Sequence, residues 1–178
     1  MDHILRRWQL GGFVFTAVGG TLLHYVYDWS GGFSLLGVIS SVNESVWEHM
    51  KLLFIPAFLF TLIEMIAFGE HYSHFWRSKL LGILIGLLLI PTLYYTYTGA
   101  LGLRLVWLDI SLFYIAAAAT FFLETRLLLR HSRSGTWELP SMLLIWLLAF
   151  AFLIFTYFPP CLPVFQDPLT FTYGIPQK

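Results

Sequence analysis

Five stretches of this chain are long and apolar enough to cross a lipid bilayer as helices. A helix needs about 20 predominantly apolar residues to span the hydrocarbon core. The chain meets that requirement at residues 9–27, 44–68, 80–98, 106–129 and 139–158, the second becoming apolar at Met50. Only 11% of its residues are charged, against about 25% in a typical soluble domain. The pattern predicts an all-α membrane protein, with residues 1–178 forming one bundle of five transmembrane helices.

Two further segments do not fit a membrane-spanning helix. Residues 33–40 are apolar but too short to span, and they follow a glycine-rich break, so we expect a re-entrant or interfacial segment after the first helix. The tail at 159–178 contains five prolines, which forbid a helix, yet it is too apolar for ordinary disorder. We expect it to fold back over the outer mouth of the bundle, either as a lid or as a belt of interfacial anchors.

The distribution of lysine and arginine predicts the orientation. If five helices alternate, one side carries Arg6, Arg7, Arg77, Lys79, Arg126, Arg130 and Arg133. The other side carries only Lys51, Arg104 and Lys178. Cytoplasmic loops are enriched in positive residues, so the pattern predicts a multi-pass cell-membrane protein whose N-terminus is cytoplasmic and whose C-terminus lies outside.

Charge, cysteine content and small residues limit the possible partners. The net charge is zero, which gives no basic surface for nucleic acid, and the single cysteine, Cys161, excludes an internal disulfide. The lipid bilayer is the expected partner. Gly82 and Gly86 form a GxxxG pattern, which favours close helix packing. It indicates either a homodimer contact or ordinary membrane-helix composition.

Polar side chains gather at the predicted outer ends of the helices. His24 and Asp28 are one turn apart at the end of the first helix, and Glu44 and Glu48 are one turn apart at the start of the second. Asp109 lies near the outer end of the fourth helix. Ionised groups near hydrocarbon cost about 2.5–3.5 kcal/mol on insertion scales, so they usually face the bundle interior. The cluster therefore predicts a polar pocket at the outer face.

The residue types in this pocket suggest two kinds of chemistry. Histidine and carboxylate groups on one face suit a divalent metal such as zinc, and a carboxylate in a dry pocket can act as a general base. The candidate metal ligands are His24, Asp28, Glu48 and His49, and the candidate acid–base groups are Glu44 and Glu48. The other candidate pocket or ligand-binding residues are Asp28, Asn43, Asp109, Asp167 and Glu64.

Structural alternatives exist for these residues. No HExxH motif is present, and the adjacent Glu48 and His49 point about 100° apart on a helix. Ser45-x-x-Glu48 has the form of a capping box, and Glu48 could instead pair with Lys51. Glu64, inside the second helix, is either a proton carrier or the partner of an arginine such as Arg126 or Arg77.

Three stretches resemble an uncharacterised family of small bacterial membrane proteins, defined as a domain of unknown function. They are HYVYDWSGG at 24–32, SVNESVWEHMKLLFIP at 41–56 and YFPPCLPVFQDPLTFTYGI at 157–175. The third departs from the family pattern at Phe171, where the resemblance implies glycine. The resemblance implies no activity. All three stretches map to the same predicted outer face as the polar cluster.

Three functions are compatible with the sequence, which leaves open whether the protein is an enzyme. The first is an outer pocket that binds a metal or a polar ligand, as in a membrane-embedded hydrolase. The second is a small transporter or channel component, in which Glu64 and Asp109 line a path. The third is a non-catalytic membrane subunit or scaffold.

Overall fold

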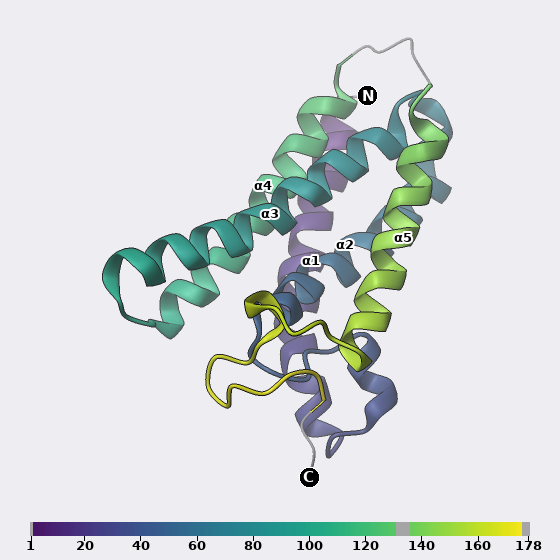
Figure 1. Ribbon diagram of the computed structural model, residues 1–178. Coiled ribbons are helices and arrows are strands. Elements are labelled where there is room, and N and C mark those ends of the chain that lie inside the picture. Colours follow the sequence, from purple (N-terminus) through teal and green to yellow (C-terminus); the bar gives the residue numbers. More distant parts are fainter. Residues whose placement is uncertain (1, 131–135, 176–178) are drawn as a thin grey trace.

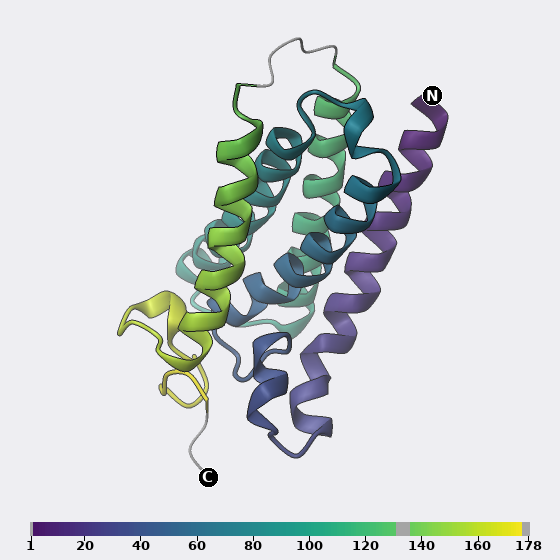
Figure 2. The same ribbon diagram turned by 90° about the vertical axis from the view of Figure 1, so that its right-hand side faces the viewer.

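The structure, a computed structural model, describes residues 2–130 and 136–175, and the regular elements within them are helices (Figures 1 and 2). In chain order these are α1 (Asp2–Trp29), η1 (Ser34–Val38), α2 (Val46–Phe68), η2 (Gly69–His71), α3 (Phe75–Leu101), α4 (Val106–Leu128), α5 (Glu138–Tyr157) and η3 (Pro163–Phe165). Arg133 and Lys178, which the orientation argument counted, lie outside the described residues.

Five of these helices are long and apolar enough to cross a membrane, as the sequence predicts. Two of them extend well beyond the apolar stretches: α1 begins at Asp2 and α3 runs from Phe75 to Leu101. Backbone hydrogen bonding continues a helix past the point where its side chains stop being apolar, so hydropathy alone underestimates these lengths. Pro56 and Pro91 both lie within continuous helices.

Helix α2 lies at the centre of the bundle and packs against all four other long helices. In its most apolar window 56% of the residues are buried, against 22–33% in the other four helices. A helix that is apolar on every side is expected to be surrounded by protein or lipid. The central position of α2 means that polar groups at its two ends are held by neighbours from several helices.

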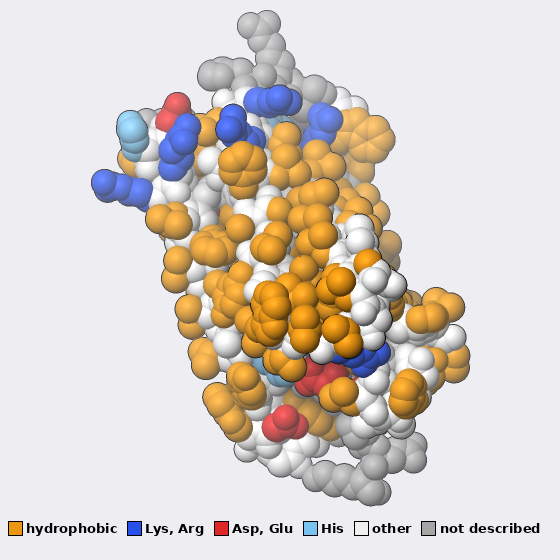
Figure 3. All heavy atoms as spheres, turned by 90° about the vertical axis from the view of Figure 1, so that its left-hand side faces the viewer, with side chains coloured by type: hydrophobic (Ala, Val, Ile, Leu, Met, Phe, Trp, Pro, Cys, Tyr) orange, Lys and Arg blue, Asp and Glu red, His pale blue; other side chains and the backbone are white. Residues whose placement is uncertain are grey.

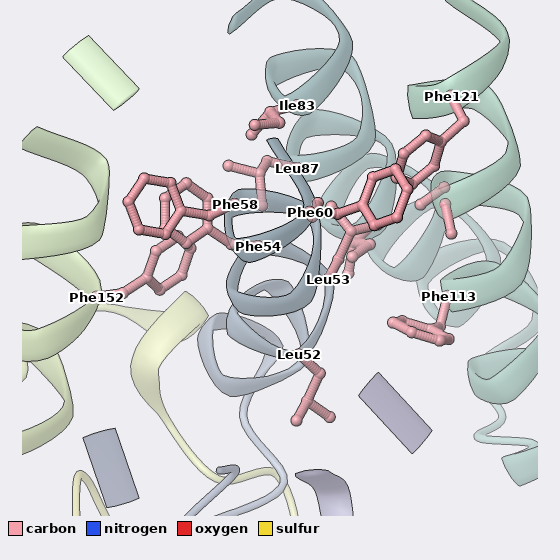
Figure 4. Packing of buried hydrophobic residues seen from close by; sticks show 14 of the residues in the cluster. Leu52, Leu53, Phe54, Phe58, Phe60, Ile83, Leu87, Phe113, Phe121 and Phe152 are labelled. Carbon is pink, nitrogen blue, oxygen red and sulfur yellow. The ribbon is translucent and has the colours of Figure 1, made fainter. Parts of the chain in front are cut away.

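Aromatic side chains fill the core on both sides of α2 (Figure 4). On one side Phe54 stacks on Phe152 of α5, with ring centroids 4.9 Å apart. On the other side Phe60 meets Phe121 of α4 edge to face, with centroids 6.3 Å apart. Offset and edge-to-face pairs of this kind contribute about 0.5–1.5 kcal/mol beyond their burial. The core therefore fixes α4 and α5 on opposite sides of α2.

Gly82 and Gly86 face α4 of the same chain. A side-chain carbon at Gly82 would clash with Glu124, and one at Gly86 would clash with Thr120 and meet the backbone of Ala116. The GxxxG pattern thus allows the close approach of α3 and α4, which form a long hairpin on one side of the bundle (Figure 1). A homodimer through these glycines is untested by a single chain.

The two ends of the bundle carry different charges. On the face shown in Figure 3, most lysine and arginine side chains gather at the end where α1 begins, whereas acidic and histidine side chains are seen at both ends. The segment after α5 lies at the other end, opposite the first turn of α1 (Figure 1). The charge asymmetry agrees with the side assignment made from the sequence, while the orientation in a membrane stays a prediction.

A buried ion pair locks the polar segment before α2 to the bundle. Lys51 Nζ lies 2.6 Å from Glu48 Oε2 and donates to the Gly37 carbonyl at 2.7 Å and to Thr156 Oγ1 at 2.8 Å. The Val42 N–H donates to the same Glu48 oxygen at 3.0 Å. These contacts join η1, α2 and α5, so the pairing of Glu48 with Lys51 that the sequence suggested is present.

Candidate metal centre

The segment between α1 and α2 is held against the end of α1 by hydrogen bonds. Ser40 Oγ accepts from the Tyr27 N–H at 2.9 Å and donates to the carbonyl of Leu23. Ser45 is the N-cap of α2, accepting from the Glu48 N–H at 3.3 Å, and the Ser45 N–H donates to Asn43 at 2.9 Å. Half of the predicted capping box is therefore present, while the Glu48 carboxylate binds Val42 and Lys51 instead.

This arrangement brings three potential metal ligands together. His24 Nε2 lies 3.7 Å from Glu44 Oε2, and His49 Nε2 lies 3.6 Å from the same oxygen. One ligand atom from each residue falls within 4.8 Å of the others. Ligands at about 2.0–2.2 Å from a tetrahedral zinc ion are about 3.3–3.6 Å apart. The separations of His24 Nε2 and His49 Nε2 from Glu44 Oε2 are therefore close to those between ligands of a bound zinc ion.

Hydrogen bonding orients His49 for metal binding. Its Nδ1 lies 2.9 Å from the carbonyl oxygen of Ser45. A carbonyl oxygen only accepts, so Nδ1 carries the proton in the neutral ring and Nε2 keeps its lone pair. This is the arrangement in which a backbone carbonyl fixes the tautomer of a metal-binding histidine. The His24 ring packs edge-on against His49, with centroids 5.4 Å apart.

The three candidate ligands border a cavity of about 420 Å³ between α1, α2, α3 and α4. Its walls are mainly apolar, with Leu52, Ile90 and Phe113 among them. Its polar lining comprises Thr21, His24, Tyr25, Glu44, His49, Tyr94, Arg104, Asp109 and Tyr114. Acidic and histidine side chains are visible together on this side of the molecule in Figure 3. The cavity thus combines a charged rim with an apolar interior.

The tail contributes to the same site. Pro168 and Leu169 line the cavity, and the Glu44 N–H donates to Asp167 Oδ2 at 3.5 Å. Asn43 Nδ2 donates to the carbonyl of Gly174 at 2.9 Å. The segment that carries Glu44 is therefore held by the tail, and this is the role that the structure gives to Asn43 and Asp167.

Three other residues that the sequence predicted for the site do not line the cavity. Asp28 is exposed and is not among the cavity-lining residues, and Glu48 is buried against Lys51. Glu64 is buried with Lys79, a partner other than the expected Arg126 or Arg77. The structure thus brings Glu44 together with His24 and His49 as a candidate ligand set. The sequence had instead predicted Asp28 and Glu48 as the carboxylate ligands beside the two histidines.

Several site residues carry no signal in the sequence. Tyr94, Tyr97 and Tyr114 look like interfacial aromatics, yet Tyr94 and Tyr114 line the cavity and Tyr97 donates to Asp109. Tyr114 Oη lies 2.9 Å from Thr21 Oγ1 on α1. Only the packing of the helices brings these three tyrosines to the cavity and its surroundings.

Comparison with known proteins gives a family and no function. A family model described as "Family of unknown function (DUF6512)" matches residues 2–175. No curated protein matches the chain, and no solved structure matches it.

Proposed function

The chain belongs to this family of unknown function, and from its own side chains we propose that it binds a divalent metal ion, zinc in the first instance, at the outer mouth of the bundle. The ligands are His24, Glu44 and His49. The observation that carries the proposal is the convergence of their ligand atoms within 4.8 Å of one another, on the rim of a cavity.

The ligand set favours a reactive site over a purely structural one. Structural zinc sites use four protein ligands, commonly with cysteine, whereas catalytic sites use three and leave a position for water or substrate. Two histidines and one glutamate form a set of the catalytic kind. The only cysteine, Cys161, is in the tail and is not among the cavity-lining residues. Hydrolysis is the reaction class that this donor set serves best.

The cavity suggests an amphiphilic substrate. Its apolar walls suit an acyl chain or another lipid-like group, and its rim carries Arg104, which would attract an anionic headgroup. Asp109 is the cavity-lining carboxylate that remains when Glu44 serves as a ligand, and Tyr97 donates a hydrogen bond to it. We assign Asp109 the role of general base for an attacking water molecule, which a zinc ion held by His24, Glu44 and His49 would activate.

Metal analysis of the purified protein tests this proposal. The wild type, loaded with zinc in detergent and freed of excess metal, is expected to retain one zinc ion per chain. His24→Ala, Glu44→Gln and His49→Ala are each expected to lower that content. His71→Ala is the matched control, because His71 is exposed on η2 near the opposite end of α2. Equal zinc content in wild type and His49→Ala would contradict the site.

An activity assay separates metal binding from hydrolysis. Fluorogenic esters with acyl chains of increasing length are incubated with the zinc-loaded protein in mixed micelles. We expect hydrolysis that a chelator abolishes and that Asp109→Asn reduces while leaving the zinc content intact. Zinc retention without hydrolysis of any ester would support the metal site and remove the assignment as an esterase.

A further inference from the structure

A second charged cluster lies inside the bundle, on the part of α2 away from the proposed metal centre. It consists of Gln9 on α1, Glu64 on α2, Lys79 on α3 and Glu124 on α4. None of the four is more than 2% exposed. Four helices each supply one polar side chain to a single buried group within the membrane-spanning part of the chain.

Lys79 is the centre of this cluster. Its Nζ lies 2.5 Å from Glu124 Oε2 and forms an ion pair with Glu64. Gln9 Nε2 donates to Glu64 Oε1 at 2.6 Å. The rings of Phe75 and Phe121 lie 5.8 and 5.7 Å from the ammonium nitrogen and exclude water from it. Because Gly82 has no side chain, the Glu124 side chain can lie directly against the backbone of α3 at this position.

The formal charges of these groups do not balance. Two carboxylates and one ammonium leave a net charge of −1 inside an apolar bundle. An uncompensated buried charge is so costly that the group takes up a proton instead. A metal cation is a poor alternative, because the ammonium of Lys79 already occupies the position between the two carboxyl groups.

The neighbouring titratable groups do not supply the missing charge. Tyr72 is a neutral phenol whose pKa is raised by burial and by the charges of Asp2 and Glu64. His74 Nε2 lies 2.9 Å from the carbonyl oxygen of Leu127. Arg126 is exposed and lies over the ring of Phe122. Arg6 and Arg7 on α1 are exposed as well.

We infer that the Gln9–Glu64–Lys79–Glu124 cluster is a proton-binding site that holds one proton on Glu124. Glu64 accepts a hydrogen bond from Gln9 on Oε1 and faces the Lys79 ammonium as an ion pair on Oε2, and both neighbours favour its ionised form. Glu124 receives Lys79 on Oε2, while its Oε1 is buried and has no hydrogen-bond partner among the described residues. Gln9 Oε1 and Glu64 Oε2 are likewise buried and make no hydrogen bond among the described residues.

This inference gives a simple rule for substitutions. The number of bound protons equals the number of carboxyl groups minus the number of ammonium groups. The wild type therefore holds one proton. Glu64→Gln and Glu124→Gln each hold none, because the remaining carboxylate balances Lys79. Lys79→Met holds two.

Infrared spectroscopy of the protein in lipid nanodiscs tests the rule. The carbonyl stretch of a protonated carboxyl, identified by its shift in heavy water, is expected in the wild type at neutral pH. It should disappear in Glu64→Gln and in Glu124→Gln and double in Lys79→Met. Glu70→Gln, an exposed change on η2, is the control and should leave the band unchanged. Glu124→Asp should move the band, whereas Glu64→Asp should not.

Clear outcomes would overturn the inference. If the wild type lacks the carbonyl band of a protonated carboxyl group, the inference is wrong. This measurement uses no variant, so it does not depend on whether Lys79→Met folds. A band that survives in both glutamine variants would place the proton outside the cluster. A band that sodium ions abolish would assign the site to a monovalent cation.

Discussion

His49 Nε2 lies 3.6 Å from Glu44 Oε2, while the Ser45 carbonyl oxygen lies 2.9 Å from the other nitrogen of the same ring. The ring is thus oriented in advance, with its lone pair toward the carboxylate. The His24, Glu44 and His49 side chains are 30%, 40% and 24% exposed, so an ion from solution can reach them.

Metal binding should stabilise the fold through this arrangement. At a zinc concentration of about 100 times Kd, the free energy of unfolding should rise by about 2.7 kcal/mol. Thermal unfolding in detergent, followed by tryptophan fluorescence, measures the shift, and a chelator should reverse it. His71→Ala should keep the shift and His49→Ala should lose it. Equal shifts in the two variants would mean that zinc binds elsewhere.

The buried pair of Lys51 and Glu48 should show strong energetic coupling. Lys51→Met leaves the Glu48 carboxylate buried without its partner, at an expected cost of about 3–5 kcal/mol. Adding Glu48→Gln should recover part of that loss, because no unpaired charge then remains. Urea unfolding of the single and double variants gives the coupling energy. Strictly additive losses would show that the two side chains do not stabilise each other.

The close contact between α3 and α4 should be sensitive to one added methyl group. Gly86→Ala places a carbon against Thr120 and the Ala116 backbone and should destabilise the protein by about 1–3 kcal/mol. Gly99→Ala on the same helix is the matched control, because open space surrounds Gly99, and should be neutral or stabilising by up to about 1 kcal/mol. Thermal unfolding of both variants checks the difference. Similar behaviour of the two would argue against the packing described.

The tail should be stabilised by glycine at Phe171. Phe171 is the one non-glycine residue with positive φ (+58°) in the described part of the chain, and this conformation costs about 1–2 kcal/mol for a residue with a side chain. Its ring is 70% exposed, so its removal loses little burial. Phe171→Gly should slow amide exchange at Asp167, whose N–H donates to the carbonyl oxygen of Thr172.

Phe33→Gly is the control for this change, since Phe33 is exposed and has φ of −68°. It should give no such protection. Faster exchange at Asp167 in Phe171→Gly than in wild type would show that the strain is absent or is offset by contacts of the ring.

The orientation in the membrane can be tested with the single native cysteine. Cys161 is exposed in the tail, so a membrane-impermeant maleimide should label it in intact cells if the C-terminus lies outside. A second variant, Cys161→Ser with His71→Cys, places the thiol on η2 at the opposite end of α2. It should be labelled only after the membrane is opened. The reverse pattern would invert the orientation.

The sequence by itself determined the five apolar helices and the placement of most acids and histidines near the ends of these helices. Both are properties of local composition, since the bilayer requires about 20 apolar residues in succession and disfavours charge within them. The assignment of the loop lysines and arginines to two sides of the membrane followed from the same helices, because successive spans alternate in direction. Glu48 and Lys51 could also be paired in advance, because they are one turn apart on one helix.

Only the tertiary structure decided which distant side chains meet. His24 joins Glu44 and His49 because Ser40 fastens the intervening segment to α1, and Glu64 pairs with Lys79 because α2 and α3 pack along their length. The orientation argument counted Lys79 among the positive residues outside the spans, yet its side chain is fully buried. Hydropathy is read along the chain, whereas these pairings depend on how helices far apart in sequence pack, which their local composition does not specify.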